Sequence, residues 1–566
     1  MKSFFGDLKN IISDRRCSIP VILTALLSFG WQLTRFNVGI DDTVRFRYFG
    51  GGSFSQGRFA GVIVKYMFGL VKAFPFFEPF LAVLFLTAAA FLMILLFKRA
   101  AKGAVPDGIL TFFACAFVSY PLINEIFVYK GSDINICVGY FLTAVALLIT
   151  SGIFRKRENS DEKPSAKSIV LRLVSATLVM IFTVSLYEAL AAVYLVTASL
   201  LIFAEITVSE KKTMKKDLTE TPEEKTPEPH YGRNFFILLI PAAAGTVIEY
   251  IAGLIVNSLV DFEYSIPAGA GIYLPESLNG EYFVNMIYTI GRRLFLAGIW
   301  YFPVGMFVFC LAASLAVFIA VGIVKKRGTA ALCAIGTYAG LFGIPILAGG
   351  TVKYRNCIEF APFVAFMLAF LICIATLRFK GNGRRIIANV LAGIIIILQA
   401  VSLNISFYDN DLRWQEEKAV LVDCGEALTS DENLNLKEKP VIFIGDYRLS
   451  DNILSRKYVR ADDPVYKLIK GAALGAGFKL ETTDLDDEYV LAVCQSDFGS
   501  VISWGIHDAY SCNEELLLVF KELGYEFTQG SRERYDELTA NLEAFPVFNE
   551  TGVFTELEDC IVVRFR

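Results

Sequence analysis

The sequence predicts an all-α polytopic membrane protein of about eleven spans with one interfacial helix, followed by a smaller soluble α/β domain. Three observations lead to this fold class. Of the 566 residues, 55% are hydrophobic and 19% are charged, a balance too apolar for a soluble protein of this size. Long apolar runs recur as far as Leu403, and each can cross about 30 Å of hydrocarbon. Beyond Leu403 the composition becomes that of a soluble domain.

The transmembrane helices are predicted from apolar runs of sufficient length. The run 168–206 is too long for one helix at about 1.5 Å per residue, so we divide it near Ser185–Glu188, where the single charge of its middle lies. No small-residue cleavage site follows the basic N-terminus, so we interpret the first span as retained. The predicted spans are 18–36, 79–97, 108–126, 134–154, 168–185, 187–206, 235–260, 296–324, 329–348, 357–377 and 386–403.

The segment from Arg58 to Phe74 is apolar but is predicted to lie in the membrane interface. It carries Arg58, Lys65 and Lys72 at intervals of seven residues, which places them close to one helix face. Burying Lys65 at the bilayer centre would cost on the order of 2.5 to 3.5 kcal/mol, whereas an interfacial helix leaves all three cations in water.

Basic loops determine the predicted orientation, because Lys and Arg concentrate on the cytoplasmic side. With the N-terminus in the cytoplasm and 58–74 not counted as a span, every strongly basic loop falls inside. The loops concerned carry Lys98–Lys102, Arg155–Arg157, Lys211–Lys216, Lys325–Arg327 and Arg378–Arg385. The C-terminal domain is then extracytoplasmic, and so are the loops around Asp41, Glu125, Glu188 and Arg355.

Two domains are predicted, a transmembrane domain over 1–403 and an extracytoplasmic α/β domain over 404–566. In the second domain, strand-like runs at 441–444, 489–494 and 560–565 alternate with helical patterns such as 514–523. The run KGAALGAGF from Lys470 is only loosely similar to a nucleotide-binding loop, and we interpret it as structural.

Composition also excludes several classes of function. The net charge of −4 and the two histidines argue against nucleic-acid binding, and no His/Cys cluster has the spacing of a structural zinc site. The eleven cysteines are scattered without paired spacing, so they indicate small core residues and not a disulfide framework.

The stretch Asp41–Arg58, DDTVRFRYFGGGSFSQGR, places two carboxylates, three arginines and several glycines between two strongly apolar segments. Adjacent acids cannot share one face of a helix or strand, so of Asp41 and Asp42 one is expected to serve function and the other structure. We expect these carboxylates to be solvated. The alternative is a polar loop that only caps a membrane hairpin.

Three further constellations are candidates for binding. Tyr187 and Glu188 could bind sugar hydroxyls, or could form a wetted hairpin turn. Lys353 and Arg355 form a pair of cations in a short external loop, suited to a phosphate at the membrane surface. Glu249 lies inside a span, where an acid must be paired, protonated or wetted; it is either a functional group or a buried acid bonded to a neighbouring helix.

Four short motifs resemble the GtrII-type glucosyltransferases, which are GT-C-fold membrane enzymes. They are the DD pair, QGRF at Gln56–Phe59, SLYEA at Ser185–Ala189 and KYR at Lys353–Arg355, within residues 20–400. The resemblance implies inverting transfer of a hexose, typically glucose, from a polyprenyl-phosphate-linked donor to a cell-surface glycan on the outer side of the cytoplasmic membrane. The sequence departs from the family pattern at Phe59, where Trp is common, and at Glu188, where Gln is frequent.

The residue types fit this hexosyltransferase chemistry. An acceptor hydroxyl needs a carboxylate base, for which the candidates are Asp42 and Asp41, and the departing lipid phosphate needs cations. The candidate cations are Arg45, Arg58, Lys353 and Arg355. No cofactor is predicted, because the lipid carries the activated sugar. No metal site is indicated either, although the two acids could hold one together with Glu125, which we also include among the substrate-binding candidates.

Two other classes of function remain open at this point. A non-enzymatic lipid-linked glycan transporter or flippase would also need external polar groups, but transporters tend to show internal repeats and interrupted helices, and we find neither. A structural subunit whose soluble tail recruits partners is the third interpretation. An assay with a labelled lipid-phosphate sugar separates them by turnover, translocation alone, or neither.

Overall fold

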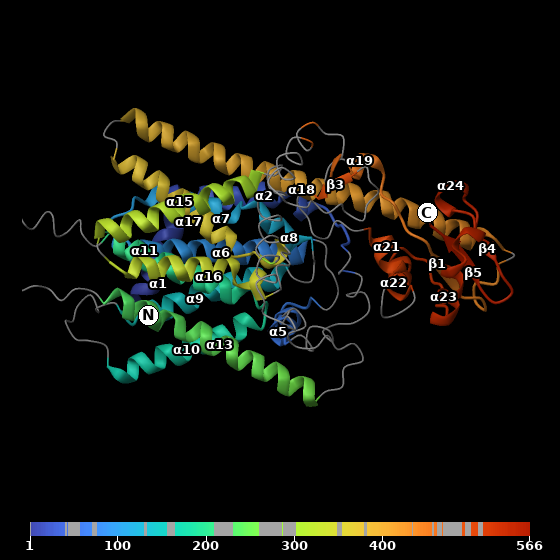
Figure 1. Cartoon of the computed structure of the whole chain (residues 1–566), viewed down its shortest axis with the longest axis horizontal. Helices are drawn as coiled ribbons and strands as arrows, with labels where there is room; N and C mark the ends of the chain where they lie inside the picture. Colours follow the sequence, from blue (N-terminus) through green and yellow to red (C-terminus); the bar gives the residue numbers. More distant parts are fainter. Residues whose placement is uncertain are drawn as a thin grey trace, which may run out of the picture.

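The structure is a computed structural model of the chain. It describes residues 2–39, 42, 57–70, 76–128, 133–154, 165–208, 230–259, 286, 302–325, 327–347, 354–378, 382–432, 434–454, 458–460, 464, 467, 489–492, 500–507 and 513–565. Long helices run side by side in one bundle, and a smaller domain of short helices and strands lies beyond one end of it (Figure 1).

The helices of the bundle follow from apolar segments whose backbone groups must bond within the segment. Their bounds are α1 Lys2–Ser13, α2 Arg15–Thr34, α5 Phe59–Met67, α6 Phe77–Ala100, α7 Asp107–Val118, α8 Asn124–Phe127, α9 Asp133–Ser151, α10 Ala166–Val184, α11 Leu190–Val208, α13 Tyr231–Leu259, α15 Phe302–Lys325, α16 Thr329–Leu347, α17 Phe360–Arg378 and α18 Asn382–Ser430, with 3₁₀ turns η2 Pro121–Ile123 and η5 Tyr354–Asn356.

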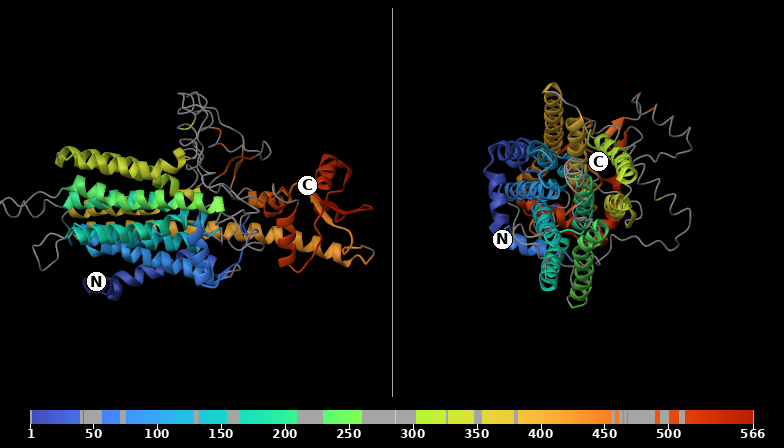
Figure 2. Two further views of the ribbon diagram at one scale, coloured as in Figure 1. Left: turned by 90° about the horizontal axis from the view of Figure 1, so that it is seen from below. Right: turned by 90° about the vertical axis from the view of Figure 1, so that its left-hand side faces the viewer.

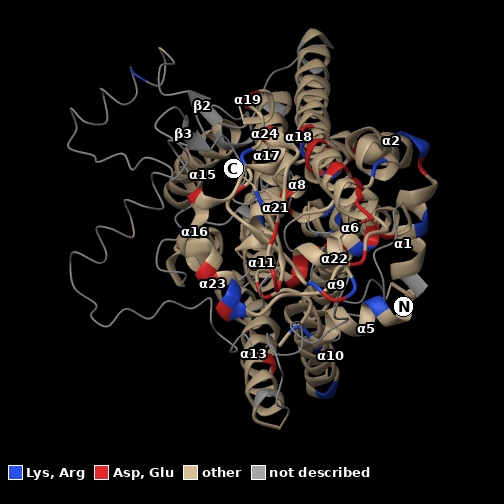
Figure 3. Ribbon diagram, turned by 90° about the vertical axis from the view of Figure 1, so that its right-hand side faces the viewer, with Lys and Arg blue, Asp and Glu red and all other residues tan. Residues whose placement is uncertain are grey.

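All the predicted spans coincide with helices. Within the described residues, ten helices are long and apolar enough to cross a membrane, and Phe360–Thr376 is a shorter apolar helix at the position of the eleventh. The chain is therefore a multi-pass membrane protein. The outer helices α10 and α13 carry few charged residues and expose large apolar side chains such as Leu171 and Ile251, as a lipid-facing surface requires (Figure 3).

The prediction that the segment after Arg58 does not cross the membrane is confirmed by the length of α5. This helix has nine residues and ends at Met67, and Gly69, with a φ of +70°, turns the chain just after it. At about 1.5 Å per residue it is far too short to cross the hydrocarbon. It lies near the end of the bundle that faces the smaller domain (Figure 1).

Aromatic packing and a few polar pairs hold the bundle together. Phe117 meets Tyr140 edge to face, with ring centroids 5.2 Å apart, and joins α7 to α9. The Ser119 hydroxyl donates to Gln399 at 2.8 Å, and Asn124 donates to Ser406 at 2.6 Å. These bonds bind α18 to the segment between α7 and α8, and they satisfy polar groups that would otherwise be costly to bury.

The C-terminal domain mixes helices and strands, as predicted. Strand β1 pairs in parallel with β5, which pairs antiparallel with β4, while β2 and β3 form a separate antiparallel pair. The bounds are β1 Val441–Ile444, α19 Asp451–Leu454, β2 Tyr458–Arg460, β3 Tyr489–Ala492, α21 Val501–Ile506, α22 Glu514–Glu522, α23 Arg532–Ala540, η6 Leu542–Ala544, α24 Phe548–Thr551, β4 Thr555–Glu556 and β5 Ile561–Arg564.

Helix α18 joins the two parts of the molecule. Its 49 residues run without a break from the bundle into the smaller domain (Figure 1). The predicted boundary at residue 403 lies within this helix and stays a prediction based on composition.

The N-terminus and the C-terminal domain lie at opposite ends of the bundle (Figure 2). Lys98 and Arg99 share the N-terminal end, because Arg99 forms an ion pair of 2.6 Å with Asp7 of α1. This arrangement is compatible with a cytoplasmic N-terminus, which remains a prediction of the charge pattern.

Cysteine labelling tests the orientation. We expect Glu522→Cys in the C-terminal domain to react with a membrane-impermeant thiol reagent on intact cells, in a background carrying Cys494→Ser and Cys512→Ser. Lys9→Cys in α1 is the matched control and should react only after the membrane is opened, because both side chains are exposed but lie at opposite ends. The reverse pattern would contradict the predicted orientation.

Candidate active site

The loop after α2 is described at Asp42 but not at Asp41 or Arg45, which lie outside the described residues. The side chain of Asp42 is buried, with 3% exposed. Its Oδ2 accepts the Gly39 N–H at 2.9 Å, and its own N–H donates to the Gly39 carbonyl at 3.1 Å. The expectation of a solvated carboxylate is therefore wrong for Asp42, which closes a tight turn.

The turn at Gly39 is packed against the segment that follows α8. A Cβ atom at this position would lie 2.9 Å from the carbonyl oxygen of Val128, closer than side chains normally approach. The close approach of the two backbones explains glycine here.

Arg58 and Glu188 form the centre of the candidate site. The Arg58 Nε donates to Glu188 Oε1 at 3.1 Å and Nη2 donates to Oε2 at 3.0 Å, a two-pronged contact between side chains that are 31% and 48% exposed. The guanidinium also lies over the Tyr187 ring, with Cζ 4.8 Å from its centroid. Planar guanidinium favours both contacts at once.

Two hydrogen bonds bring three distant segments to this centre. The Ser185 hydroxyl accepts the Ala60 N–H at 2.8 Å, which fixes the start of α5 against the turn between α10 and α11. The Tyr187 hydroxyl donates to Asn356 Oδ1 in η5. Arg355 therefore adjoins the same cluster, which we name the Arg58 cluster and define as Arg58, Tyr187, Glu188, Arg355 and Asn356.

The electrostatics of the cluster favour a charged guanidinium and a neutral phenol. Burial raises the pKa of Tyr187 to about 12, although the nearby Arg58 acts in the opposite direction. Burial alone would lower the pKa of Arg58, but the Glu188 carboxylate more than offsets this and raises it above its usual value. Arg355 acts on both groups. Tyr187 thus keeps its proton, and Arg58 its charge, throughout the physiological pH range.

Glu249 of α13 also reaches this cluster, with 7% of the residue exposed. A Cβ atom on Gly57 would lie 2.6 Å from its Oε1, and Glu188 and Arg58 both act on its carboxyl electrostatically. The sequence marked Glu249 as an acid within a span. Its position beside Gly57 and Arg58 becomes evident only in the folded chain.

Of the remaining predicted residues, Glu125 is buried in α8 and Lys353 lies outside the described residues. Glu125 and Glu359 both act electrostatically on Cys357, so the two buried acids lie near this residue, which directly follows η5. Sequence reasoning missed Glu359, which is fully buried, and neither carboxyl oxygen has a hydrogen-bond partner in the described part of the chain. An acid directly before the apolar run of α17 was the available signal.

A metal site is not found among the described residues, where no group of three or more His, Cys, Asp or Glu side chains is placed to hold an ion. A charged cavity of about 230 Å³ lies at the N-terminal end, among α1, α2, α6 and α7. Its charges pair with one another, as Arg99 with Asp7 and Lys98 with Asp107, both at 2.6 Å. We interpret this cavity as structural.

The family is decided by the sequence comparison. Residues 30–374, more than half of the chain, match the family described as Glucosyl transferase GtrII. The chain belongs to the GtrII glucosyltransferase family. The matched range contains every residue of the Arg58 cluster and ends before α18 begins. This confirms the resemblance drawn from the four motifs.

Similar solved structures include two membrane transferases. The oligosaccharyltransferase of Archaeoglobus fulgidus, tethered with an acceptor peptide, has a TM-score of 0.39 and 12% identity, over 79% of this chain and 63% of that one. ArnT from Cupriavidus metallidurans, bound to undecaprenyl phosphate, has a TM-score of 0.35 and 11% identity, over 81% of this chain and 87% of that one. The chain thus spans less than two thirds of the oligosaccharyltransferase. No curated protein matches the chain.

The predicted fold class is confirmed for this family member. A helical membrane domain that includes the short helix α5 is followed by a smaller α/β domain. The roles of the individual site residues remain predictions.

Gly57→Ala tests whether the turn before Arg58 matters to transfer. Gly57 has a φ of +80°, so a side chain there should cost about 1 to 2 kcal/mol in stability. The added Cβ should also displace the Glu249 carboxyl and shift Arg58. Gly103→Ala is the matched control, because Gly103 has a φ of +73° and its Cβ would meet nothing within 4 Å.

We expect similar losses in melting temperature for the two variants, and a loss of glycosyl transfer of about tenfold or more in Gly57→Ala alone. Equal activity in both would show that the Gly57–Glu249 contact does not affect the site.

Proposed function

We propose that the chain is an inverting hexosyltransferase that moves a sugar, with glucose the first candidate, from a polyprenyl-phosphate-linked donor to a cell-surface glycan outside the cytoplasmic membrane. Membership of the GtrII family supports glycosyl transfer. The Arg58 cluster, at the bundle end that faces the C-terminal domain, supports a donor held at the membrane surface.

The observation that carries the proposal is the geometry of Arg58. Glu188 takes the Nε and Nη2 sides of the guanidinium, and the Arg58 side chain stays 31% exposed. We assign binding of the donor phosphate to this exposed part of Arg58. Arg355 supplies a second cation nearby. Two guanidinium groups at the end of the membrane helices can neutralise a lipid phosphate whose prenyl chain stays in hydrocarbon.

The neighbours of Arg58 suit the sugar. Glu188, nearly half exposed, can accept hydrogen bonds from sugar hydroxyls while it keeps Arg58 oriented. The raised pKa of Tyr187 leaves its hydroxyl a neutral donor. In the proposed reaction an acceptor hydroxyl attacks the anomeric carbon and the bond to the phosphate oxygen breaks. The hydroxyl proton passes to a carboxylate, and polyprenyl phosphate leaves, held by the cations.

The base is proposed to be one of the two adjacent acids, Asp41 and Asp42. The burial of Asp42 decides which of them we propose. The Asp42 Oδ2 atom accepts a hydrogen bond from the Gly39 N–H, and the residue is almost inaccessible to solvent. We therefore assign Asp42 to stabilising the turn. Asp41 is then the proposed base. This assignment follows the rule that adjacent acids serve different purposes.

Arginine substitutions test the donor site. Arg58→Ala and Arg355→Ala should each lower kcat/KM for the lipid-phosphate sugar roughly 10- to 150-fold, since charge-assisted contacts contribute about 1.5 to 3 kcal/mol. Arg58→Lys keeps the charge but loses the two-pronged geometry, so its loss should be smaller.

Arg35→Ala is the control for the donor site, because Arg35 is exposed at the C-terminal end of α2 and lies over the Trp31 ring, 5.2 Å from its centroid. Unchanged kcat/KM in both cluster variants would remove the donor phosphate from this site. Translocation of labelled donor without transfer by the wild-type protein would instead favour a lipid-linked glycan transporter.

Substitution of the two acids tests the base. Asp41→Asn should lower kcat by about 10² to 10⁴, the usual contribution of a general base, with little change in melting temperature. Asp42→Ala should lower both activity and melting temperature, because it leaves the Gly39 N–H without its acceptor. Wild-type turnover in Asp41→Asn would disprove its role as the base.

A further inference from the structure

A buried ion pair lies on the part of α18 that has left the bundle. Arg413 and Glu417, one helical turn apart, are 2% and 0% exposed, and Arg413 Nη1 donates to Glu417 Oε2. Removing two charges from water is expensive, and such a pair is often no more stabilising than apolar side chains of the same size. Stability alone is therefore a weak reason for this pair. The two residues also contact the turn at Asp42 and the C-terminal domain, which suggests a second role.

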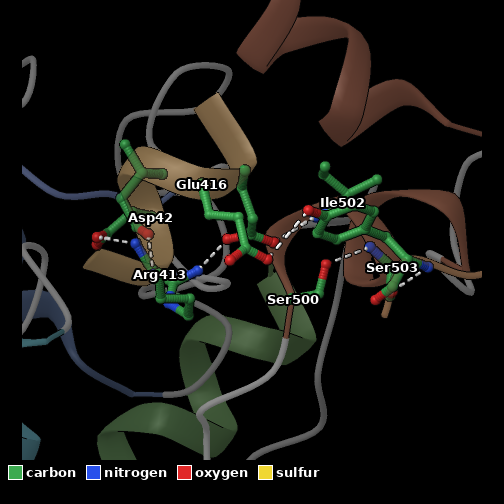
Figure 4. A network of polar contacts seen from close by, with 10 residues as sticks. Asp42, Arg413, Glu416, Ser500, Ile502 and Ser503 are labelled. Atoms are coloured by element: carbon green, nitrogen blue, oxygen red, sulfur yellow. Dashed lines mark hydrogen bonds and ion pairs between the residues drawn. The ribbon is translucent and has the colours of Figure 1, made fainter. Parts of the chain in front are cut away.

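In one direction the pair reaches the turn that contains Asp42. Arg413 Nη2 donates to the carbonyl oxygen of Val38. The next residue, Gly39, gives its N–H to Asp42 Oδ2 at 2.9 Å. Figure 4 shows Asp42 and Arg413 beside each other at one end of the polar network. One guanidinium therefore fixes the backbone of the turn that the Asp42 carboxylate closes.

In the other direction the pair reaches the C-terminal domain. Glu417 Oε1 accepts the Ile502 N–H of α21 at 3.3 Å. The adjacent Glu416 accepts the Ser450 N–H at 2.8 Å and the Tyr447 hydroxyl at 3.2 Å. Figure 4 shows Asp42 and Arg413 on one side of this network and Ser500 and Ile502 on the other, with Glu416 between them. The ion pair itself reaches α21 through the bond from Ile502 to Glu417.

Apolar contacts run along the same path. Val38, Val128 and Trp414 belong to one buried cluster with the strands and helices of the C-terminal domain. The loop after α2 thus packs on the C-terminal domain as well as on the bundle. Its position depends on residues that lie outside the matched range 30–374.

From this geometry we infer that Arg413 is a positioning residue for glycosyl transfer, through which the C-terminal domain holds Val38, Gly39 and Asp42 in the place that transfer requires. The inference rests on the proposed function for its catalytic part. Its structural part, the fixing of the turn by Arg413, stands on the contacts alone. The donor site is separate, because the Arg58 cluster is held by α5, η5 and the turn between α10 and α11.

The test replaces the whole pair, because Arg413→Ala alone would leave Glu417 buried without its cation and unfold the region. The variant is Arg413→Met/Glu417→Leu. We expect a melting temperature near that of wild type, KM for the lipid-phosphate sugar within about twofold, and kcat lowered about 10- to 100-fold, since a small misplacement of a catalytic group has effects of this size. The exposed pair Arg532–Asp536 on α23 has the same spacing, and Arg532→Ala/Asp536→Ala is the matched control.

A conservative variant guards against misfolding of the double variant. Arg413→Lys keeps a cation for Glu417 but lacks the planar fork that also reaches the Val38 carbonyl. It should fold and lose kcat while KM is retained. Wild-type kcat in a folded Arg413→Lys or Arg413→Met/Glu417→Leu protein would overturn the inference, and so would equal changes in kcat and KM.

Hydrogen exchange provides a readout that does not need transfer. In both Arg413 variants the amides of Val38 to Asp42 should exchange about tenfold faster, while those at the start of α5 keep their wild-type rates. If wild-type protein transfers no sugar, the proposed function and the catalytic part of the inference fail, yet faster exchange at Gly39 would still support the fixing of the turn by Arg413. Unchanged exchange at Gly39 would overturn that role whatever the activity.

Discussion

Hydrocarbon offers no hydrogen-bond partners, so the backbone of each crossing segment must satisfy its own polar groups, and this constraint underlies most of the molecule. In the described part of the chain, ten long apolar helical segments and the shorter Phe360–Thr376 meet it with helical backbone. Polar side chains then gather where the helices end. Arg58, Tyr187 and Glu188 lie at such an end, with Arg58 between the short helix α5 and the turn after α10.

The Arg58 cluster shows how a site is built from ends of helices that are remote in sequence. The Arg58–Glu188 pair joins residues 130 positions apart, and the Tyr187–Asn356 bond joins residues 169 apart. Both partners of the ion pair are partly exposed, so the pair itself contributes little to stability. Its value lies in orientation, because Glu188 and the Tyr187 ring hold the guanidinium plane in one position.

The turn at Asp42 is held differently, by groups that are withdrawn from water. Asp42, Arg413 and Glu417 are each at most 3% exposed. Buried charges tolerate little rearrangement, since any move that breaks a contact leaves a charge unpaired. The contacts of Arg413 and Glu417 thereby join Val38 and the C-terminal domain in one polar network. The α/β fold of the C-terminal domain provides the apolar side chains against which Val38 and Trp414 are buried.

The sequence by itself determined the spans, the short helix after Arg58 and the α/β character of the C-terminal domain, because apolar length and local periodicity depend on neighbouring residues alone. Four short motifs indicated the family. Only the tertiary structure decided which polar groups meet. In the sequence Glu249 is a single acid within an apolar span, but in the folded chain its carboxyl group lies next to Gly57. Asp42 was expected to be solvated but is buried, because the group that covers its turn, Arg413, comes 375 positions after Val38. Whether a loop residue is buried depends on which distant parts of the chain pack against the loop. The local sequence of the loop does not contain that information.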